Sequence, residues 1–145
     1  MIILDTNVLS ALMQTAPEPR VVAWLDQQAP ADVWLCAVTV FEARYGLAAL
    51  PAGERKAKLL ARFDTLLHEV LLDRVVPFDD AAAQHAAQLA ANRKQRGTVV
   101  DMRDTFIAGI ATARRAAIAT RNTRHFADLT VPVINPFLGP AGQNP

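Results

Sequence analysis

The 145-residue chain lacks the features that would assign it to a secreted or membrane-spanning class. Its single cysteine, Cys36, has no partner for an internal disulfide, so we expect a reducing compartment and a packing role for this residue. No apolar run reaches transmembrane length, and the opening "IIL" is too short for a signal peptide. These absences predict a soluble, cytoplasmic protein that does not bind a membrane.

Excess charge and the common catalytic motifs are also missing. The net charge is +1, with no basic tail or acidic block, so bulk charge does not indicate a nucleic-acid partner. Local basic groups remain candidates for contacts with an RNA backbone, although we favour solvated helix faces for the first three: Arg93, Lys94, Arg96 and Arg121. No glycine-rich nucleotide loop, zinc motif or serine-hydrolase motif occurs.

Short apolar strands alternate with helices along the whole chain. Strands apolar on both faces are typical of a parallel sheet covered on both sides, so we expect an α/β fold with four to five parallel strands. We expect one domain over residues 1–136 and a loose C-terminal tail over residues 137–145. The strands are expected at 1–4, 32–38, 74–78, 116–120 and 131–135, and the helices from 7 and at 19–28, 39–50, 52–72, 79–97 and 101–115.

Three acids occupy corresponding places in this pattern. Asp5 ends the first strand, Glu42 lies one turn into the helix after the second, and Asp104 lies one turn into the helix before the fourth. Ligands bind at the carboxyl ends of such strands, so we expect the three carboxylates to converge on one cleft. Oxygen ligands of this kind select Mg²⁺ or Mn²⁺. The three histidines are widely separated in the sequence, so we expect them in structural roles.

Each acid also has a plainer explanation. Asp5 is a suitable helix N-cap, and Thr39 with Glu42 has the spacing of a capping box. Asp101 is either the N-cap of the helix that carries Asp104 or an additional metal ligand, and we favour the cap. An aspartyl nucleophile of the phosphatase type would need a second carboxylate two residues after Asp5. Asn7 at that position weakens this alternative without excluding it.

The ordered set "LDTN", "TVFE", "RDTFIAGIA" and "ATRNTRHF" resembles the PIN-domain ribonucleases. The resemblance is strongest to the VapC toxins of toxin–antitoxin pairs, in the FitB-like branch. It implies a PIN-like fold and an Mg²⁺-dependent endoribonuclease, with Mn²⁺ as a possible substitute. The family's catalytic positions correspond to Asp5, Glu42, Asp104 and Asn122, the last of which is often an aspartate. The resemblance implies that Asp5 and Asp104 hold the metal and that Glu42 acts through a water or as an outer ligand.

The resemblance also implies partners. We expect an RNA substrate, a homodimer and an antitoxin whose Arg or Lys enters the acidic pocket, with DNA reached only through the antitoxin. Apolar faces of the helices at 19–28 and 39–50 are candidates for these contacts. Thr6, Asn7 and Thr120 are candidates for orienting the acids. The neutral Asn122 keeps an alternative open, namely a PIN-like interaction module that dimerises and binds an antitoxin with little catalysis.

Overall fold

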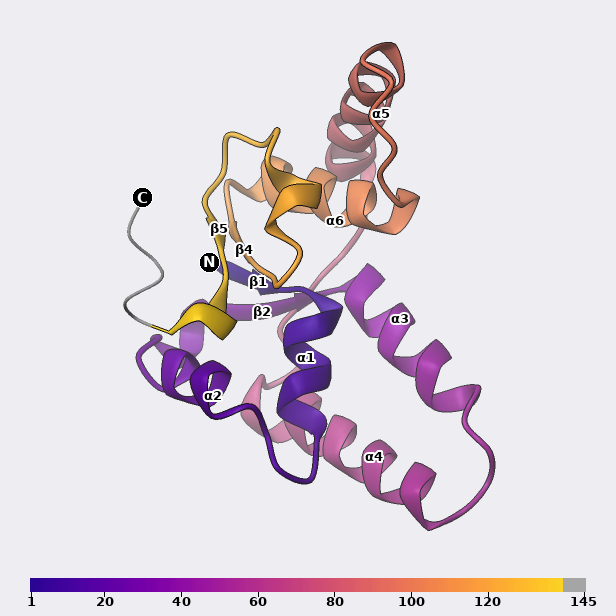
Figure 1. The fold of residues 1–145 in the computed structure, drawn as a ribbon, viewed down its shortest axis with the longest axis vertical. Helices are drawn as coiled ribbons and strands as arrows, with labels where there is room; N and C mark the ends of the chain where they lie inside the picture. The colour runs from indigo at the N-terminus through magenta and orange to yellow at the C-terminus, as the bar shows by residue number, and fades with distance from the viewer. Residues whose placement is uncertain (140–145) are drawn as a thin grey trace.

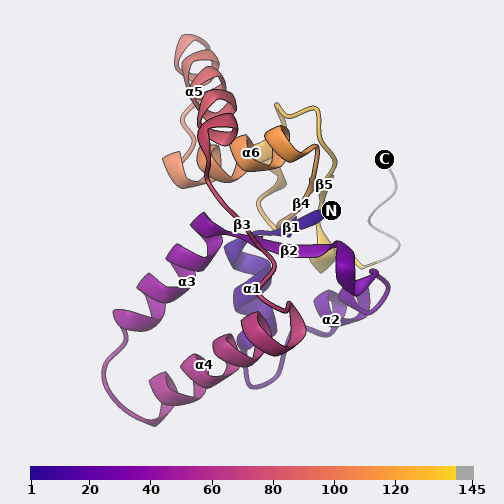
Figure 2. The ribbon, with the colours of Figure 1, turned by 180° about the vertical axis from the view of Figure 1, so that it is seen from behind.

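The computed structural model describes residues 1–139, and within them five parallel strands form one sheet in the order β3-β2-β1-β4-β5 (Figures 1 and 2). Every neighbouring pair runs parallel. The expected α/β fold with a four- to five-stranded parallel sheet is therefore confirmed. The strands are β1 (Ile2–Leu4), β2 (Val33–Cys36), β3 (Val75–Val76), β4 (Ala117–Ala119) and β5 (Val133–Ile134).

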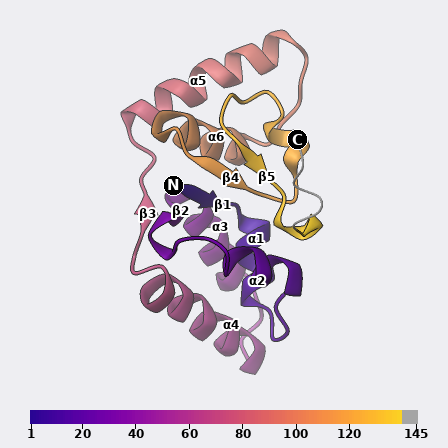
Figure 3. The ribbon, with the colours of Figure 1, turned by 90° about the vertical axis from the view of Figure 1, so that its left-hand side faces the viewer.

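Helices cover both faces of the sheet. Figures 1 and 2 show α5 and α6 on one side of the strands, and Figure 3 shows α1, α2 and α4 on the other. The helices are α1 (Thr6–Met13), α2 (Pro19–Leu25), α3 (Ala37–Ala48), α4 (Glu54–Asp64), α5 (Asp80–Gln95) and α6 (Met102–Arg114). The helix expected at 52–72 changes at Thr65 into a π-helical segment, η2 (Thr65–Val70). Short 3₁₀ turns are η1 (Pro30–Asp32), η3 (Thr123–Phe126) and η4 (Pro136–Leu138).

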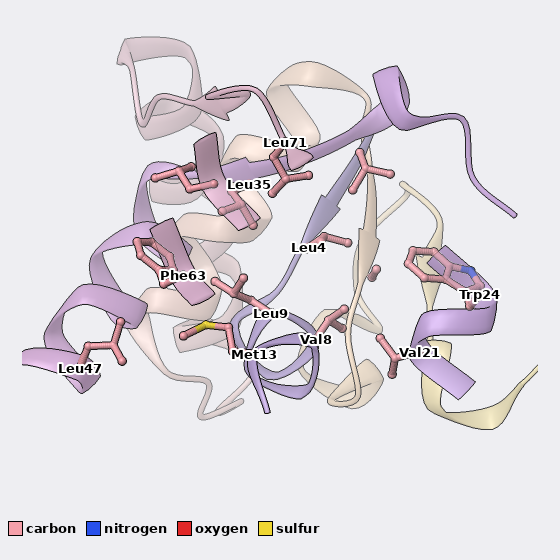
Figure 4. Close-up of a cluster of buried hydrophobic side chains, with 13 residues drawn as sticks. Leu4, Val8, Leu9, Met13, Val21, Trp24, Leu35, Leu47, Phe63 and Leu71 are labelled. Atoms are coloured by element: carbon pink, nitrogen blue, oxygen red, sulfur yellow. The ribbon is translucent and has the colours of Figure 1, made fainter. Parts of the chain in front are cut away.

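Alternation along the strands divides the core into two layers. Successive side chains of a strand point to opposite faces, so Leu4 and Ala119 join the cluster under α1, α2 and α4. Ile3 and Cys36 join the cluster under α5 and α6. Figure 4 shows the first of these clusters. Because the strands are buried on both faces, their sequences are continuous apolar runs. Cys36 is fully buried, which agrees with its expected packing role.

α5 and α6 pack unusually close together, which explains the alanine-rich sequence of α5. A Cβ added at Gly109 of α6 would lie 2.6 Å from the carbonyl oxygen of Ala82 and 2.7 Å from the Cβ of Ala86. Only glycine opposite alanine allows this approach. The contact fixes α6 against α5, and the first turn of α6 carries Asp104.

The chain after β5 does not start as a loose tail. η4 packs against α2, where a guanidinium nitrogen of Arg20 donates to the carbonyl oxygen of Phe137 at 3.2 Å. Phe137 also contacts the core cluster. The expected boundary at 137 is therefore too early, and the rest of the expected tail, residues 140–145, lies outside the described residues. Within residues 1–139, no helix has the length and apolar character to cross a membrane.

Candidate active site

The direction in which the chain adds strands to the sheet reverses between β1 and β4. The chain adds β2 and β3 on one side of β1 and then returns to add β4 and β5 on the other. In open parallel sheets, ligands bind at the carboxyl ends of the strands that flank such a switch point. Asp5 follows β1, and Thr120 follows β4. The backbone N–H of Asp5 donates to the carbonyl oxygen of Ala119 at 2.9 Å, so the two strand ends meet.

Asp5 is a buried carboxylate, with only 4% of its surface exposed. Its Oδ2 accepts hydrogen bonds from Thr120 Oγ1 and Asn7 Nδ2, both at 2.7 Å, and its Oδ1 accepts from the backbone N–H of Thr6 at 2.7 Å. Burial raises the pKa of Asp5, and these three hydrogen bonds partly oppose the rise. Asp5 thus occupies the N-cap of α1, but two of its three donors come from side chains rather than from the helix backbone.

Thr120 and Asn7 are themselves fixed, which makes the Asp5 site rigid. The hydroxyl of the fully buried Thr120 accepts from Asn7 Nδ2 at 3.2 Å and from the backbone N–H of Asn122 at 3.0 Å. Asn7 Oδ1 accepts from the backbone N–H of Arg121 at 2.9 Å. The expected orienting contacts of Thr6, Asn7 and Thr120 are all present. Asn122 lies beside this network, with an exposed side chain.

Glu42 reaches the same edge from α3. Its Oε2 accepts from Thr6 Oγ1 at 2.7 Å, so Thr6 links both acids. Burial is the main cause that raises the pKa of Glu42, and the charges of Asp5 and Asp104 raise it further. The capping-box explanation is wrong, because α3 already begins at Ala37 and the Thr39 hydroxyl donates to a β1 carbonyl oxygen instead.

Asp104 lies in the first turn of α6 and is held by a histidine that the sequence did not connect with it. His125 Nδ1 lies 2.7 Å from Asp104 Oδ2. The charge of Asp104 is also one of the causes that raise the pKa of Asp5, so the two carboxylates act on each other. His125 lies in η3, three residues after Asn122. This closeness in the sequence to a candidate site residue was the signal that could have indicated a role for His125 in the site.

Asp101 is the N-cap of α6, as favoured from the sequence. Its Oδ1 accepts from the backbone N–H of Arg103 at 2.8 Å and from Arg103 Nε at 3.0 Å, while its Oδ2 accepts from Arg103 Nη2 at 3.1 Å. These bonds hold the pKa of Asp101 below its usual value. Both of its oxygens are engaged with Arg103.

The donor set fits a cation held by few protein ligands. Among residues 1–139, no three His, Cys, Asp or Glu side chains lie close enough to hold a metal together. The expected convergence of three carboxylates is therefore looser than a three-ligand cluster, because Thr6 holds Glu42 and His125 holds Asp104. Mg²⁺ is usually bound through one or two carboxylates and keeps several waters. A buried Asp5 beside the charge of Asp104 suits that pattern.

Arg93 has a structural role that the sequence did not reveal. Only 4% of it is exposed, so neither the solvated-face explanation nor an RNA contact is correct. Its guanidinium donates to both oxygens of Asp128, at 2.8 and 2.9 Å, and to Thr105 Oγ1 at 2.8 Å. Arg93 therefore ties α5 to α6 and to the segment after η3. Arg121 is exposed, and its guanidinium stacks 3.9 Å from the ring centre of Phe137.

Two open hollows flank the acids. One, of about 580 Å³, is lined by residues that include Asn7, Ser10 and Arg121. The other, of about 310 Å³, runs between α1, α3 and α4 and is lined by Glu42, Thr6 and several apolar side chains: Met13, Ala43, Leu47, Leu50 and Leu59. The first hollow therefore reaches Asn7, which holds Asp5, and the second reaches Glu42 itself.

Comparison with known proteins agrees with this architecture. The PIN domain model matches residues 2–131. "VapC ribonuclease Y4jK" of Sinorhizobium fredii is 41% identical, over 94% of this chain and 98% of that protein. "Toxin FitB" of Neisseria gonorrhoeae is 39% identical, over 94% and 99%. The crystal structure of FitAcB from Neisseria gonorrhoeae matches with a TM-score of 0.85 at 39% identity, over 94% of this chain and 99% of that one. This chain is therefore a member of the PIN-domain family, in the group that contains the VapC and FitB toxins.

Proposed function

We propose that this protein is the toxin of a toxin–antitoxin pair and acts in the cytoplasm as an Mg²⁺-dependent endoribonuclease. Relatives that cover nearly the whole chain are a VapC ribonuclease and a FitB toxin. The observation that carries the proposal is the buried Asp5 carboxylate, held by three donors at the switch point of the sheet. A carboxylate with a raised pKa at that place is a functional-site signature.

Asp5 and Asp104 are the residues that would hold the metal, with Mn²⁺ as a substitute for Mg²⁺. When bound, such an ion would stabilise the negative charge that develops on the phosphate and would lower the pKa of a water bound to it. Thr120 and Asn7 keep Oδ2 of Asp5 in place, and His125 does the same for Asp104. Asn122 contributes a neutral amide where an aspartate would add charge.

Glu42 is the candidate proton acceptor. The fixed Thr6 hydroxyl orients one of its oxygens. Burial raises its pKa, and it outweighs the Thr6 hydrogen bond and the Arg103 charge that lower it, which suits a group that takes a proton from an attacking water. Glu42 therefore acts through a water, and its direct binding to the metal is not required.

The antitoxin contact is proposed for the hollow between α1, α3 and α4. FitAB has been solved bound to a DNA fragment, at 39% identity to this chain and a TM-score of 0.85. The apolar side chains in the lining of the hollow suit apolar side chains of an antitoxin segment, and Glu42 in the same lining suits one Arg or Lys. DNA would then be reached only through the antitoxin.

A homodimer is proposed through α3. Phe41 and Tyr45 are 57% and 64% exposed on one face of this helix, and their rings stack 6.1 Å apart. α2 does not contribute as expected, because Val21 and Trp24 are buried in the core (Figure 4). Light scattering at micromolar concentration should give the dimer mass, and Phe41→Asp should give the monomer mass. A monodisperse monomer in the wild type would contradict the dimer.

The function is tested by incubating antitoxin-free protein with structured RNAs in Mg²⁺ or in EDTA. We expect internal cleavage in Mg²⁺ only, lost in Asp5→Asn and kept in Asp64→Asn, which removes an exposed carboxylate from α4. Purifying the three proteins in parallel excludes a contaminating nuclease. Inactivity of the wild type together with tight antitoxin binding would favour the interaction module instead.

A further inference from the structure

Arg103 places a guanidinium beside the acids from the first turn of α6. Its Nε lies 3.7 Å from Glu42 Oε1, which is within ion-pair range but too far for a hydrogen bond. Its hydrogen bond to Asp101 is the first cause that raises its pKa, and the charges of Glu42 and Asp104 add to the rise. Half of the side chain, 51%, is exposed. The roles proposed above for Asp5, Asp104 and Glu42 assign no function to this cation.

Asp101 orients the guanidinium of Arg103 but leaves it exposed to solvent. Asp101 engages Nε and Nη2 of Arg103 from one side, and its carboxylate is itself half exposed. The other N–H donors of the guanidinium have no partner among residues 1–139. Exposed ion pairs contribute little to stability because water screens them. Arg103 is therefore positioned next to the acids, yet it remains available to a second anion.

The proposed reaction needs such a cation. An RNA phosphate that approaches Asp5, Glu42 and Asp104 meets like charge, which a single divalent ion offsets only in part. A planar guanidinium matches the oxygens of a phosphate and can bind two of them at once. We propose that Arg103 binds a backbone phosphate of the RNA at the scissile bond or directly beside it, and that Asp101 is its positioning residue. This inference rests on the proposed ribonuclease function.

A purely structural role for Arg103 makes a different prediction. If the residue only held the start of α6 in place, its loss would displace Asp104, so metal and RNA binding would weaken together. If it binds RNA, its loss removes a positive charge from beside the acids, so metal binding should hold or strengthen while RNA binding weakens. The two effects have opposite signs, and two separate binding measurements distinguish them.

The experiment compares wild type with Arg103→Ala, Arg103→Lys and Lys58→Ala. Lys58 is a matched control, because it is an exposed cation paired with a carboxylate, Glu54, on α4, on the other side of the sheet (Figure 1). Mn²⁺ affinity is measured by calorimetry without RNA. Binding of a short fluorescein-labelled single-stranded RNA is measured by anisotropy in EDTA, where no metal-dependent cleavage occurs, at several salt concentrations.

We expect Arg103→Ala to weaken RNA binding about tenfold and to reduce the slope of log affinity against log salt by about 0.7, the value for one lost phosphate contact on a single strand. Its Mn²⁺ affinity should equal or exceed that of wild type. Arg103→Lys should recover part of the RNA affinity, and Lys58→Ala should match wild type. Should Arg103→Ala fail to fold, Arg103→Gln keeps much of the stem and serves in the same comparison.

The inference is overturned if Arg103→Ala binds RNA with unchanged affinity and salt slope, or if it loses Mn²⁺ binding as well. Single-turnover cleavage by the wild type separates this failure from failure of the function. A wild type that cleaves RNA while Arg103→Ala binds RNA equally well refutes only the role of Arg103. A wild type that neither binds nor cleaves RNA refutes both.

Discussion

Replacing Thr120 with valine removes one hydroxyl from the centre of the site and leaves the shape of the side chain almost unchanged. That hydroxyl donates to Asp5 Oδ2 at 2.7 Å and accepts from the side chain of Asn7 and the backbone of Asn122. Thr120 is fully buried, so no water replaces the lost donor without rearrangement. The substitution therefore leaves the buried Asp5 carboxylate with one hydrogen bond fewer.

The size of the effect follows from the charge of the acceptor. A hydrogen bond to a charged group contributes about 1.5–3 kcal/mol, which corresponds to a fall in Tm of roughly 4–10 °C for a domain of this size. Loss of the same energy from the ionised form raises the pKa of Asp5 further. The hydroxyl stabilises the ionised form, so its loss adds to the rise that burial already causes.

The sign of the pH dependence follows from this shift. The loss of stability in Thr120→Val is largest above the folded pKa of Asp5, where the carboxylate is ionised, and it narrows as the pH falls through that pKa. At limiting Mg²⁺, protons compete with the metal at higher pH in the variant, so the acid limb of the rate–pH profile moves to higher pH.

Urea unfolding in EDTA at several pH values and single-turnover cleavage at fixed Mg²⁺ measure the two effects. Thr120→Ser is the control, because it keeps the hydroxyl and should restore most of both properties. The reasoning is refuted if Thr120→Val has the pH profile of wild type, or if the serine variant is as impaired as the valine variant.

Substitutions at four further positions test the framework around the acids. Gly109→Ala should lower the free energy of unfolding by about 1–3 kcal/mol through overpacking. Gly46 has open space around it, so Gly46→Ala should leave this free energy unchanged or raise it by up to about 1 kcal/mol. Urea unfolding measures both. Arg93→Ala should lower the free energy of unfolding by about 2–3 kcal/mol in the same measurement. This loss is smaller than that expected from breaking a fully buried ion pair, because Asp128 is partly exposed to water. His125→Asn can place an amide N–H where Nδ1 lies and should keep Mn²⁺ affinity in calorimetry, whereas His125→Gln should weaken it.

The positions of Asp5 and Glu42 at one edge of the sheet were predictable because they follow from strand order. Apolar runs before Asp5 and before the helix of Glu42 indicated buried parallel strands, and the carboxyl ends of such strands share one edge of a sheet. The favoured cap at Asp101 was also predictable, because capping is a local interaction within one helical turn.

Tertiary partners were not predictable from local patterns. In the sequence, Arg93 is one of several charges on an alanine-rich helix, and the partners that hold its buried guanidinium, Thr105 and Asp128, come from other segments. The contact between His125 and Asp104 joins positions from two elements whose relative placement the sequence does not state. Thr39 has the spacing of a capping residue, but the strand beside it supplies a better acceptor in the carbonyl of Leu4.

The metal site at Asp5 and Asp104 is the central claim, and Mn²⁺ titration of the antitoxin-free protein by calorimetry tests it most directly. The account predicts one dominant site in the wild type, lost in Asp5→Asn and in Asp104→Asn and kept in Asp101→Asn. Asn122→Asp should strengthen a second, weaker site by adding a charge. Mn²⁺ binding that survives in Asp5→Asn, or that is lost in Asp101→Asn, would contradict the account.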